Sequence, residues 1–464
     1  MTNWTTKPAH AIADAVRHGA VSARQVAQQH LAAIAAQNDL LKAYTDITID
    51  RALAKADAID RSRARGDSLP PLAGAPFAVK NLFDVKGIVT RAGSKINRDN
   101  APATSDATAV SRMEAAGAIL LGALNMGEYA YDFTGRNVHD GNALNPHDRT
   151  CMSGGSSGGS GAAAAAGLAS ITLGSDTNGS IRVPASLCGL FGLKPTYGAL
   201  SRAGTFPFVA SLDHVGPLAR STLDLALTYD AMRGRDPGDP VCMGGREAPV
   251  VPELAKGIAG LRIAKADGYF AQMGSPEAFA AVDAVSRALG VTATVTIPEA
   301  HRARAAAFMI TMIEGAALHI DRIRDRPQDF DPEVRDRLIA GAMLPGHWYV
   351  KAQKFRRWYH DAFLELFHTV DAILAPATPV SAPKLDQQTF RLDGQDLPVR
   401  PNLGIFTQPI SFIGLPVVIV PVWPTSGMPV GVQIIAAPGR EDIALRIAHD
   451  LERAGVVQSP VAKP

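Results

Sequence analysis

Residues 153–161 read SGGSSGGSG, and residues 162–186 continue as AAAAAGLASITLGSDTNGSIRVPAS. The first stretch alone has the composition of a flexible linker, because Gly and Ser bury no side chains and are entropically costly to order. A linker would separate two self-sufficient halves, yet an alanine-rich run, a strand-like run and a second glycine-rich turn, GSDTNGSIR, follow at once. Two such turns so close together indicate specific backbone geometry rather than slack.

Two other glycine-based motifs fit this segment poorly. A phosphate-binding P-loop requires GxxxxGK[ST], and the first lysine after these glycines is Lys194. The nucleophile-elbow pattern G-x-S-x-G matches at 154–158 and 155–159, as a Gly/Ser run gives by chance. An elbow also needs a strand directly before it, whereas the loop-like NPHDRTCMS stands there, and its triad would need a downstream His. The His candidates lie on helical patterns: His360, His368 and His449.

The flanking sequence alternates between helical and strand-like patterns. The first 60 residues are predicted to be helical, with Ser22 as an N-cap. A helix, a glycine break and an apolar strand follow at 107–125, and ASITLGSD continues the alternation. These patterns predict an α/β sheet covered by helices on both faces.

Residues 249–367 are richer in charge and helix formers, and buried strands are then expected in DAILAPATP, LPVVIVPVW and PVGVQIIAA. Strand-rich segments at both ends of a helical middle predict one sheet that distant parts of the chain complete. We therefore expect a single domain, 1–464, whose helical segment 249–367 covers the functional site.

Composition excludes several classes of function. The chain has 464 residues, 47% hydrophobic and 19% charged, which is typical of a globular protein. Lys plus Arg (46) balances Asp plus Glu (44), which disfavours a nucleic-acid or anionic-membrane partner. Three cysteines (Cys151, Cys188 and Cys242) form no CxxC pair, the start does not read as a secretory signal, and no apolar stretch is expected to span a bilayer. A soluble cytoplasmic protein is predicted.

Three ordered motifs carry a family resemblance. GAPFAVKNLFDVKG at 74–87, GGSSGGSGAAAAAG at 154–167 and GSDTNGSIRVPASLCGLFGLKPTYG at 174–198 resemble the amidase signature family. DAILAPATP and PVGVQIIAAPGRED agree, so the resemblance covers nearly the whole chain after the first helices. It implies a large mixed β-sheet surrounded by α-helices, hydrolysis of amides through a Ser–cisSer–Lys triad, and no metal or other cofactor.

The resemblance assigns the triad by motif. Ser180 is the expected nucleophile, Ser156 the bridging serine and Lys80 the base. A lysine can accept a proton only when neutral, so its pKa of ~10.4 must fall by about three units, at a cost of roughly 4 kcal/mol. The apolar residues around Lys80 are expected to provide that desolvation. The backbone N–H groups across Thr177, Asn178, Gly179 and Ser180 are expected to form the oxyanion hole.

The substrate-binding residues are expected to be Tyr131, Asp132, Asn178 and Arg182. Most relatives have DTGGS where this chain has DTNGS, and Asn is the residue besides Gly that best tolerates a positive φ. Arg182 is expected to anchor Asp176 or a neighbouring loop, with contact to a substrate carboxylate as the alternative.

Tyr131 and Asp132 favour a compact polar substrate, because relatives commonly have small or apolar residues there. The surrounding stretch is similar to the family branch that hydrolyses 1-carboxybiuret in cyanuric acid breakdown and releases ammonia. A homodimer is expected, and that branch also implies a small helical accessory subunit. Two alternatives stay open: a glutaminase-type A subunit of a tRNA-dependent amidotransferase, and an inactive scaffold subunit. The intact Lys80, Ser156 and Ser180 argue against the scaffold.

Overall fold

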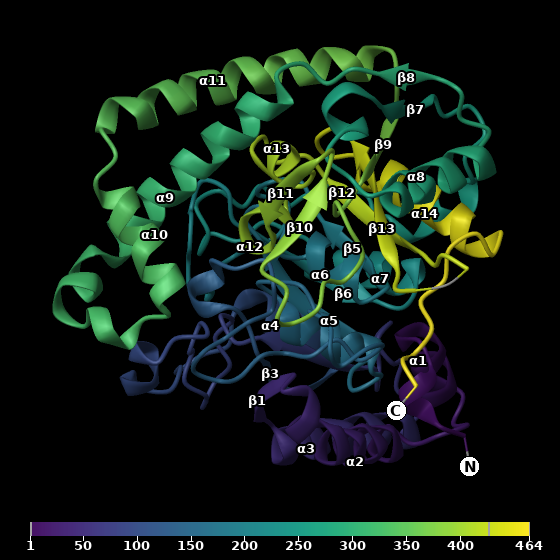
Figure 1. Cartoon of the computed structure of the whole chain (residues 1–464). Helices are drawn as coiled ribbons and strands as arrows, with labels where there is room; N and C mark the ends of the chain where they lie inside the picture. Colours follow the sequence, from purple (N-terminus) through teal and green to yellow (C-terminus); the bar gives the residue numbers. More distant parts are fainter. Residues whose placement is uncertain (1, 426, 464) are drawn as a thin grey trace.

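One mixed sheet of eleven strands organises the molecule (Figure 1). The structure, a computed structural model, describes residues 2–425 and 427–463. The strand order is β1-β3-β2-β4-β6-β5-β12-β13-β9-β7-β8, and β10 and β11 form a separate hairpin. The strands are β1 (Tyr44–Ile47), β2 (Pro76–Lys80), β3 (Ile119–Leu124), β4 (Ile171–Asp176), β5 (Phe191–Lys194), β6 (His214–Ala219), β7 (Ile263–Ala266), β8 (Thr294–Val295), β9 (Ala372–Pro376), β10 (Thr389–Leu392), β11 (Gln395–Pro398), β12 (Val417–Val422) and β13 (Val430–Ala436).

Helices surround this sheet (Figure 1). They are α1 (Ala9–Arg17), α2 (Ala23–Leu41), α3 (Ile49–Ala64), α4 (Thr108–Ala115), α5 (Gly158–Ala165), α6 (Arg182–Leu187), α7 (Thr222–Met232), α8 (Pro276–Ala288), α9 (Ala300–Asp325), α10 (Pro332–Ala342), α11 (Gly346–Leu364), α12 (Val399–Asn402), α13 (Gln408–Ser411) and α14 (Glu441–Arg453). The predicted α/β class, with a large mixed sheet inside helices, is confirmed.

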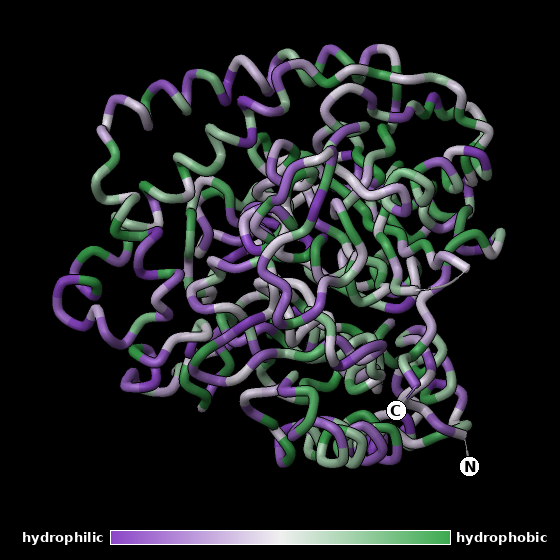
Figure 2. Tube along the Cα trace, in the orientation of Figure 1, coloured by the Kyte–Doolittle hydropathy of each residue, from purple (hydrophilic) through white to green (hydrophobic). Residues whose placement is uncertain are grey.

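Strands from the N-terminal and the C-terminal parts of the chain form this one sheet. Strands β3, β2 and β4 run parallel, whereas β4, β6, β5, β12, β13 and β9 pair antiparallel in that order. Every residue of β2, β3 and β4 is buried, as expected for strands covered on both faces. Hydrophobic residues accordingly gather in the interior, and hydrophilic ones lie mostly toward the outside (Figure 2).

Local signals explain several boundaries. Ser22 caps α2 as predicted, and Gln25 completes a capping box with it. The predictions for 1–60 and 249–367 missed β1, β7 and β8, which extend the sheet at its edges. These strands have only two to four residues, and such short segments between helical patterns carry no detectable period-2 alternation.

Helix α9 corrects another expectation. By length and composition it is apolar enough to cross a membrane, with a window of mean hydropathy 1.2 that is 44% buried. By length and composition, residues 300–325 therefore contradict the expectation that no apolar stretch could span a bilayer. In the fold α9 packs against α10, α11 and α13, as the core helix of a globular protein does.

Candidate active site

The Gly/Ser segment is a packed wall rather than a linker. All of residues 153–161 are buried, and the chain turns through them into α5. Gly154 has φ +79°, and a Cβ there would lie 2.8 Å from Pro184 Cα. A Cβ on Gly159 would lie 2.5 Å from the carbonyl oxygens of Ala43 and Asn125. The peptide bond between Gly155 and Ser156 is cis.

Lys80 ends β2 with its side chain fully buried. Its Nζ lies 2.7 Å from Ser156 Oγ and 2.8 Å from Ser175 Oγ. Burial lowers the pKa of Lys80 from 10.5 to about 7, against the opposing charges of Asp213, Asp176 and Asp132. The pKa therefore lies where the amine has a substantial neutral fraction at neutral pH.

Ser180 lies in the turn that follows β4. Among the described residues, the backbone N–H groups of 177–180 donate to no protein acceptor, which leaves them free for an oxyanion. Gly179 has φ +145°, and a Cβ there would lie 2.3 Å from Thr407 Oγ1. Asn178 is not among the non-glycine residues with a positive φ, so tolerance of positive φ is not what Asn provides here.

Arg182 anchors Asp176 and the turn beside it, which is the first of the two roles expected for it. The side chain is fully buried and pairs with Asp176 through Nε and Nη2, each at 3.0 Å. Its other donors bond Thr407 O at 3.0 Å, Gln433 Oε1 at 2.9 Å and Ser411 Oγ. No guanidinium donor is left for a substrate, so the prediction of Arg182 as a substrate-binding residue does not fit this geometry.

The carboxylate of Asp132 holds the loop that follows it as well as facing the pocket. Its carboxylate accepts hydrogen bonds from the backbone N–H groups of Thr134 and Gly135, at 2.8 and 2.7 Å. Arg400 Nε lies 3.0 Å from the other oxygen, Oδ1. Ser157, beside the bridging serine, hydrogen-bonds the carbonyl of Ser175 at 3.2 Å and so supports the end of β4.

A small pocket of about 20 Å³ opens at Ser180. Tyr131, Asp132, Thr177 and Asn178 line it, as do groups from distant segments. Those distant groups are Phe208, Phe308 of α9, Arg337 of α10, Pro401 of α12 and Gln408 of α13.

Three buried polar atoms of this lining have no partner among the residues that the structure describes: Tyr131 Oη, Asn178 Oδ1 and Gln408 Nε2. Asn178 Nδ2 donates to Thr311 at 2.8 Å, and Gln408 Oε1 accepts from Arg304 at 2.9 Å, which fixes the amide of Gln408 with its NH₂ free. The pocket therefore offers both acceptors and donors to a polar ligand.

Sequence reasoning missed four residues of this region: Ser175, Arg337, Arg400 and Gln408. Ser175 stands inside the GSDTNGS motif and could have been weighed as a lysine partner. Arg337 stands in FDPEVRDRLIAGAMLP, a stretch similar to the 1-carboxybiuret branch, but no role was assigned to it. Arg400 and Gln408 are single polar residues in segments without a motif. Only the fold brings Arg337 and Gln408 to the pocket and Arg400 to Asp132. Among the described residues, no group of three His, Cys, Asp or Glu side chains could hold a metal ion.

Comparison with known proteins shows the family of the chain. A family model described as "Amidase" matches residues 25–445. The AtzE component of a 1-carboxybiuret hydrolase from Pseudomonas sp. (strain ADP) is 54% identical over 449 residues, which covers 96% of this chain and 98% of the relative. The A-type component of a glutamyl-tRNA(Gln) amidotransferase from Koribacter versatilis (strain Ellin345) is 37% identical, covering 95% and 96%.

A solved structure is also similar across nearly all of the chain. It is described as "An unexpected vestigial protein complex reveals the evolutionary origins of an s-triazine catabolic enzyme". It has a TM-score of 0.97 and 53% sequence identity, and covers 99% of this chain and 100% of that one. With a family model that spans most of its length and a relative that is 54% identical over 96% of it, the chain belongs to the amidase family.

Proposed function

We propose that this chain hydrolyses the terminal amide of a small polar substrate of the biuret type, 1-carboxybiuret, and releases ammonia in s-triazine catabolism. The observation that carries the proposal is the buried contact of Lys80 Nζ with Ser156 Oγ at 2.7 Å, beside a polar pocket lined by Ser180. The 54% identity to a component of 1-carboxybiuret hydrolase supports the substrate class over glutamine, because the amidotransferase component is 37% identical.

In the proposed cycle, neutral Lys80 accepts a proton from Ser156, which accepts one from Ser180 as its Oγ attacks the amide carbonyl. Lys80 Nζ also donates a hydrogen bond to Ser175 Oγ at 2.8 Å. This contact orients the lone pair of the amine toward Ser156. The carbonyl oxygen, now anionic, accepts hydrogen bonds from the free N–H groups of 177–180. Ser156 then gives its proton to the departing nitrogen, the C–N bond breaks, and ammonia leaves an acyl group on Ser180. Water repeats the sequence and releases the acid.

The test is ammonia release from a panel of biuret-type ureas, glutamine and simple amides. Turnover of biuret-type ureas by the wild type, and its loss in Ser180→Ala with an unchanged thermal midpoint, is the expected result. Turnover of glutamine alone would replace the substrate class with that of the amidotransferases. Full activity in Ser180→Ala would remove Ser180 as the nucleophile.

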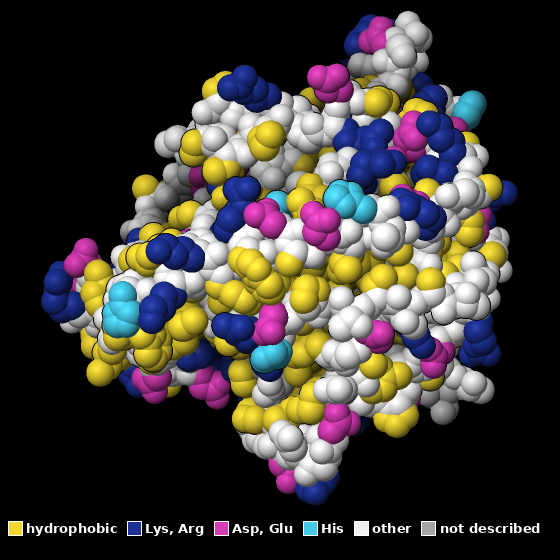
Figure 3. Space-filling view, turned by 90° about the horizontal axis from the view of Figure 1, so that it is seen from above, with side chains coloured by type: hydrophobic (Ala, Val, Ile, Leu, Met, Phe, Trp, Pro, Cys, Tyr) yellow, Lys and Arg dark blue, Asp and Glu magenta, His cyan; other side chains and the backbone are white. Residues whose placement is uncertain are grey.

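The same proposal covers the domain, its partners and its location. We propose a single domain in which α9 and α10 cover the site, since Phe308 and Arg337 line the pocket. Exposed apolar side chains on α11 and just after α10, among them Met343, Trp348 and Trp358, offer a surface for a second copy or a small helical partner protein. Seen from above, the molecule shows hydrophobic side chains among charged ones (Figure 3). The cysteines are buried and free, which suits the reducing cytoplasm.

A further inference from the structure

We infer that the side-chain oxygen of Asn178 accepts a hydrogen bond from an N–H group on the acyl side of the attacked carbonyl. The residue thereby selects ureas over amides whose carbonyl is bonded to carbon. The inference rests on the proposed function and names the bond pattern that is recognised, N–CO–N in place of C–CO–N. Three features of the site lead to it: the fixed position of Asn178, its free oxygen, and the donors and acceptors around that oxygen.

The buried turn after β4 holds Asn178 at several points. Thr407 Oγ1 donates to the carbonyl oxygen of Asn178 at 2.7 Å, and the preceding Thr177 donates through Oγ1 to Asp213 at 2.6 Å. The side-chain Nδ2 of Asn178 donates to Oγ1 of Thr311 at 2.8 Å, and Thr311, on α9, is fully buried. The backbone and the side chain of Asn178 are therefore oriented before a substrate binds, as selective recognition requires.

The other end of the Asn178 amide is an acceptor without a donor. Its Oδ1 is buried and has no hydrogen-bond partner among the residues that the structure describes. Asn178 is only 6% exposed and lines the pocket beside Ser180. A buried acceptor that stays unpaired is costly, so a ligand that covers this oxygen is expected to bring a donor to it.

The chemistry of the site decides which donor that is. The attacked carbonyl oxygen is itself an acceptor and faces the N–H groups of 177–180. The leaving nitrogen faces Ser156, which has to give it a proton. The side chain of Asn178 instead extends toward Thr311, on the side of the pocket that Phe308 of the same helix lines. The donor that can meet Oδ1 there is an N–H on the acyl side of the carbonyl.

Ureas and carbon-bonded amides differ at this one atom. In biuret the acyl-side neighbour of the attacked carbonyl is an N–H group, whereas malonamide has a CH₂ group there and the same two terminal amides. The N–H group satisfies Asn178 Oδ1. The CH₂ group covers the oxygen without supplying a donor, so the acceptor stays unpaired away from water. A site of this kind disfavours the analogue that lacks the N–H.

The next group along a urea chain also finds a partner. Beyond the N–H stands a second carbonyl, and the pocket presents the free NH₂ of Gln408, whose Oε1 accepts from Arg304 at 2.9 Å. An acceptor on Asn178 together with a donor on Gln408 matches the N–H and C=O of a urea chain. Malonamide carries the same second carbonyl, so Gln408 does not distinguish the two compounds and the difference falls on Asn178.

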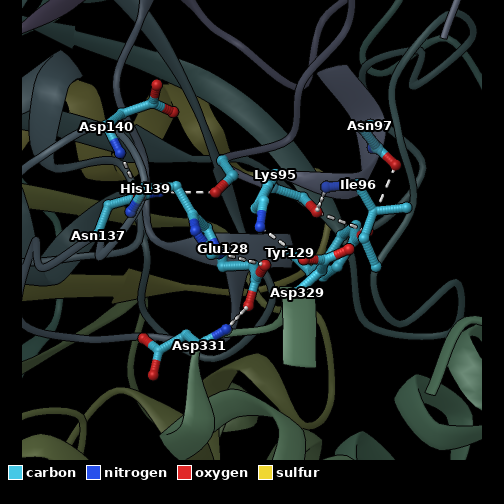
Figure 4. A network of polar contacts seen from close by, with 12 residues as sticks. Lys95, Ile96, Asn97, Glu128, Tyr129, Asn137, His139, Asp140, Asp329 and Asp331 are labelled. Atoms are coloured by element: carbon cyan, nitrogen blue, oxygen red, sulfur yellow. Dashed lines mark hydrogen bonds and ion pairs between the residues drawn. The ribbon is translucent and has the colours of Figure 1, made fainter. Parts of the chain in front are cut away.

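The pocket has to widen for such a chain, because about 20 Å³ holds little more than one water molecule. A buried network fixes the turn that carries Tyr131 (Figure 4). In it Glu128 Oε1 lies 2.9 Å from His139 Nε2, and Glu128 Oε2 accepts from the backbone N–H of Asp331 at 2.7 Å. With this turn and the turn after β4 both fixed, the widening falls to half-buried side chains such as Phe308, and Asn178 Oδ1 keeps its place.

The test compares biuret with malonamide in two assays. Ammonia release gives kcat/KM for each compound, and calorimetry with Ser180→Ala gives the affinity for each whether or not it is turned over. The measured quantity is the ratio of biuret to malonamide, because the intrinsic reactivity and hydration of the compounds cancel when a variant is compared with the wild type. Asn178→Ala should lower this ratio about 10-fold or more, mainly by weakening biuret, with malonamide changed less than about threefold.

Two more variants accompany Asn178→Ala. Asn178→Asp is the matched control because it keeps an acceptor of the same size. Its ratio should stay within about threefold of the wild type, although a negative charge beside the oxyanion slows both compounds. Thr311→Val releases the Asn178 amide without altering the turn, and the ratio should fall about threefold.

The outcomes separate the inference from the proposed function. A wild-type ratio in Asn178→Ala, or an equal fall in Asn178→Asp, overturns the inference while amide hydrolysis stands. Equal losses for both compounds in Asn178→Ala would mean that Asn178 only supports the turn, and that also overturns it. If Asn178→Ala does not fold, the ratio in Thr311→Val decides in the same way. A wild type that releases ammonia from glutamine alone contradicts the proposed function itself, and the calorimetric ratio still tests Asn178.

Discussion

Replacing the buried Lys80 with methionine should abolish hydrolysis and change how stability depends on pH. Burial lowers the pKa of Lys80 from 10.5 to about 7, and each pH unit of that difference corresponds to about 1.4 kcal/mol. Between these two values the unfolded chain binds a proton that the folded chain does not, so lower pH favours unfolding. At pH 7 this linkage lowers the free energy of unfolding of the wild type by about 4 kcal/mol relative to a chain without the amine.

The stability of the wild type should therefore rise relative to Lys80→Met as the pH goes from 7 toward 10. Denaturant unfolding of both proteins across that pH range measures the difference between their free energies of unfolding. The contributions of the other titrating groups cancel in that difference. Ser180→Ala is the control: it should be inactive yet keep the wild-type pH dependence of stability. In the active enzyme, kcat/KM should rise with pH through about 7, because the base must be neutral. Parallel stability curves for the wild type and Lys80→Met would mean that Lys80 is charged in the fold and cannot be the base.

Two further substitutions test the surroundings of this lysine. Ser175→Ala removes one of the two partners of Lys80 Nζ, and kcat should fall about 10-fold with KM unchanged; wild-type kcat would show that Ser175 does not orient the amine. Arg182→Met leaves the Asp176 carboxylate buried without its partner, and the free energy of unfolding should fall by about 3–5 kcal/mol in denaturant titrations. An unchanged denaturation midpoint would refute the anchoring role of Arg182.

The central fold could be predicted because its signals are local. Strands β2 and β3 are mainly apolar runs and β4 begins as one, and each lies where the sequence indicates. Strands β1, β7 and β8 could not be predicted, since two to four residues at a sheet edge are defined by their partners and not by their own periodicity. The pairing of β5 with β12, more than 200 residues apart, likewise depends on the tertiary fold.

The site divides in the same way. Lys80, Ser156 and Ser180 stand in contiguous motifs, because their chemistry requires particular turns of the backbone. Gln408 stands in a short helical segment, and nothing in its neighbours marks it. The stretch around Arg337 carries a resemblance to one branch of the family, but that resemblance assigns no role to Arg337. Asn178 shows the limit of local reasoning: its place in the turn was predicted, but the positive φ expected there falls on Gly179.

This division has a consequence for how specificity can change in such an enzyme. The groups proposed for bond cleavage end β2 and β4 or lie in the buried turns beside them, where a Cβ on Gly159 or Gly179 already meets backbone or side-chain atoms. Other groups that line the pocket come from α9, α10 and α13, and α10 and α13 each pack against α9. A substitution on these helices can alter the pocket without moving Lys80. The reason is that Lys80 is held by the close-packed sheet, to which these helices contribute no strand. Substrate choice is thus expected to vary with the pocket residues of 300–411, whereas Lys80, Ser156 and Ser180 stay fixed.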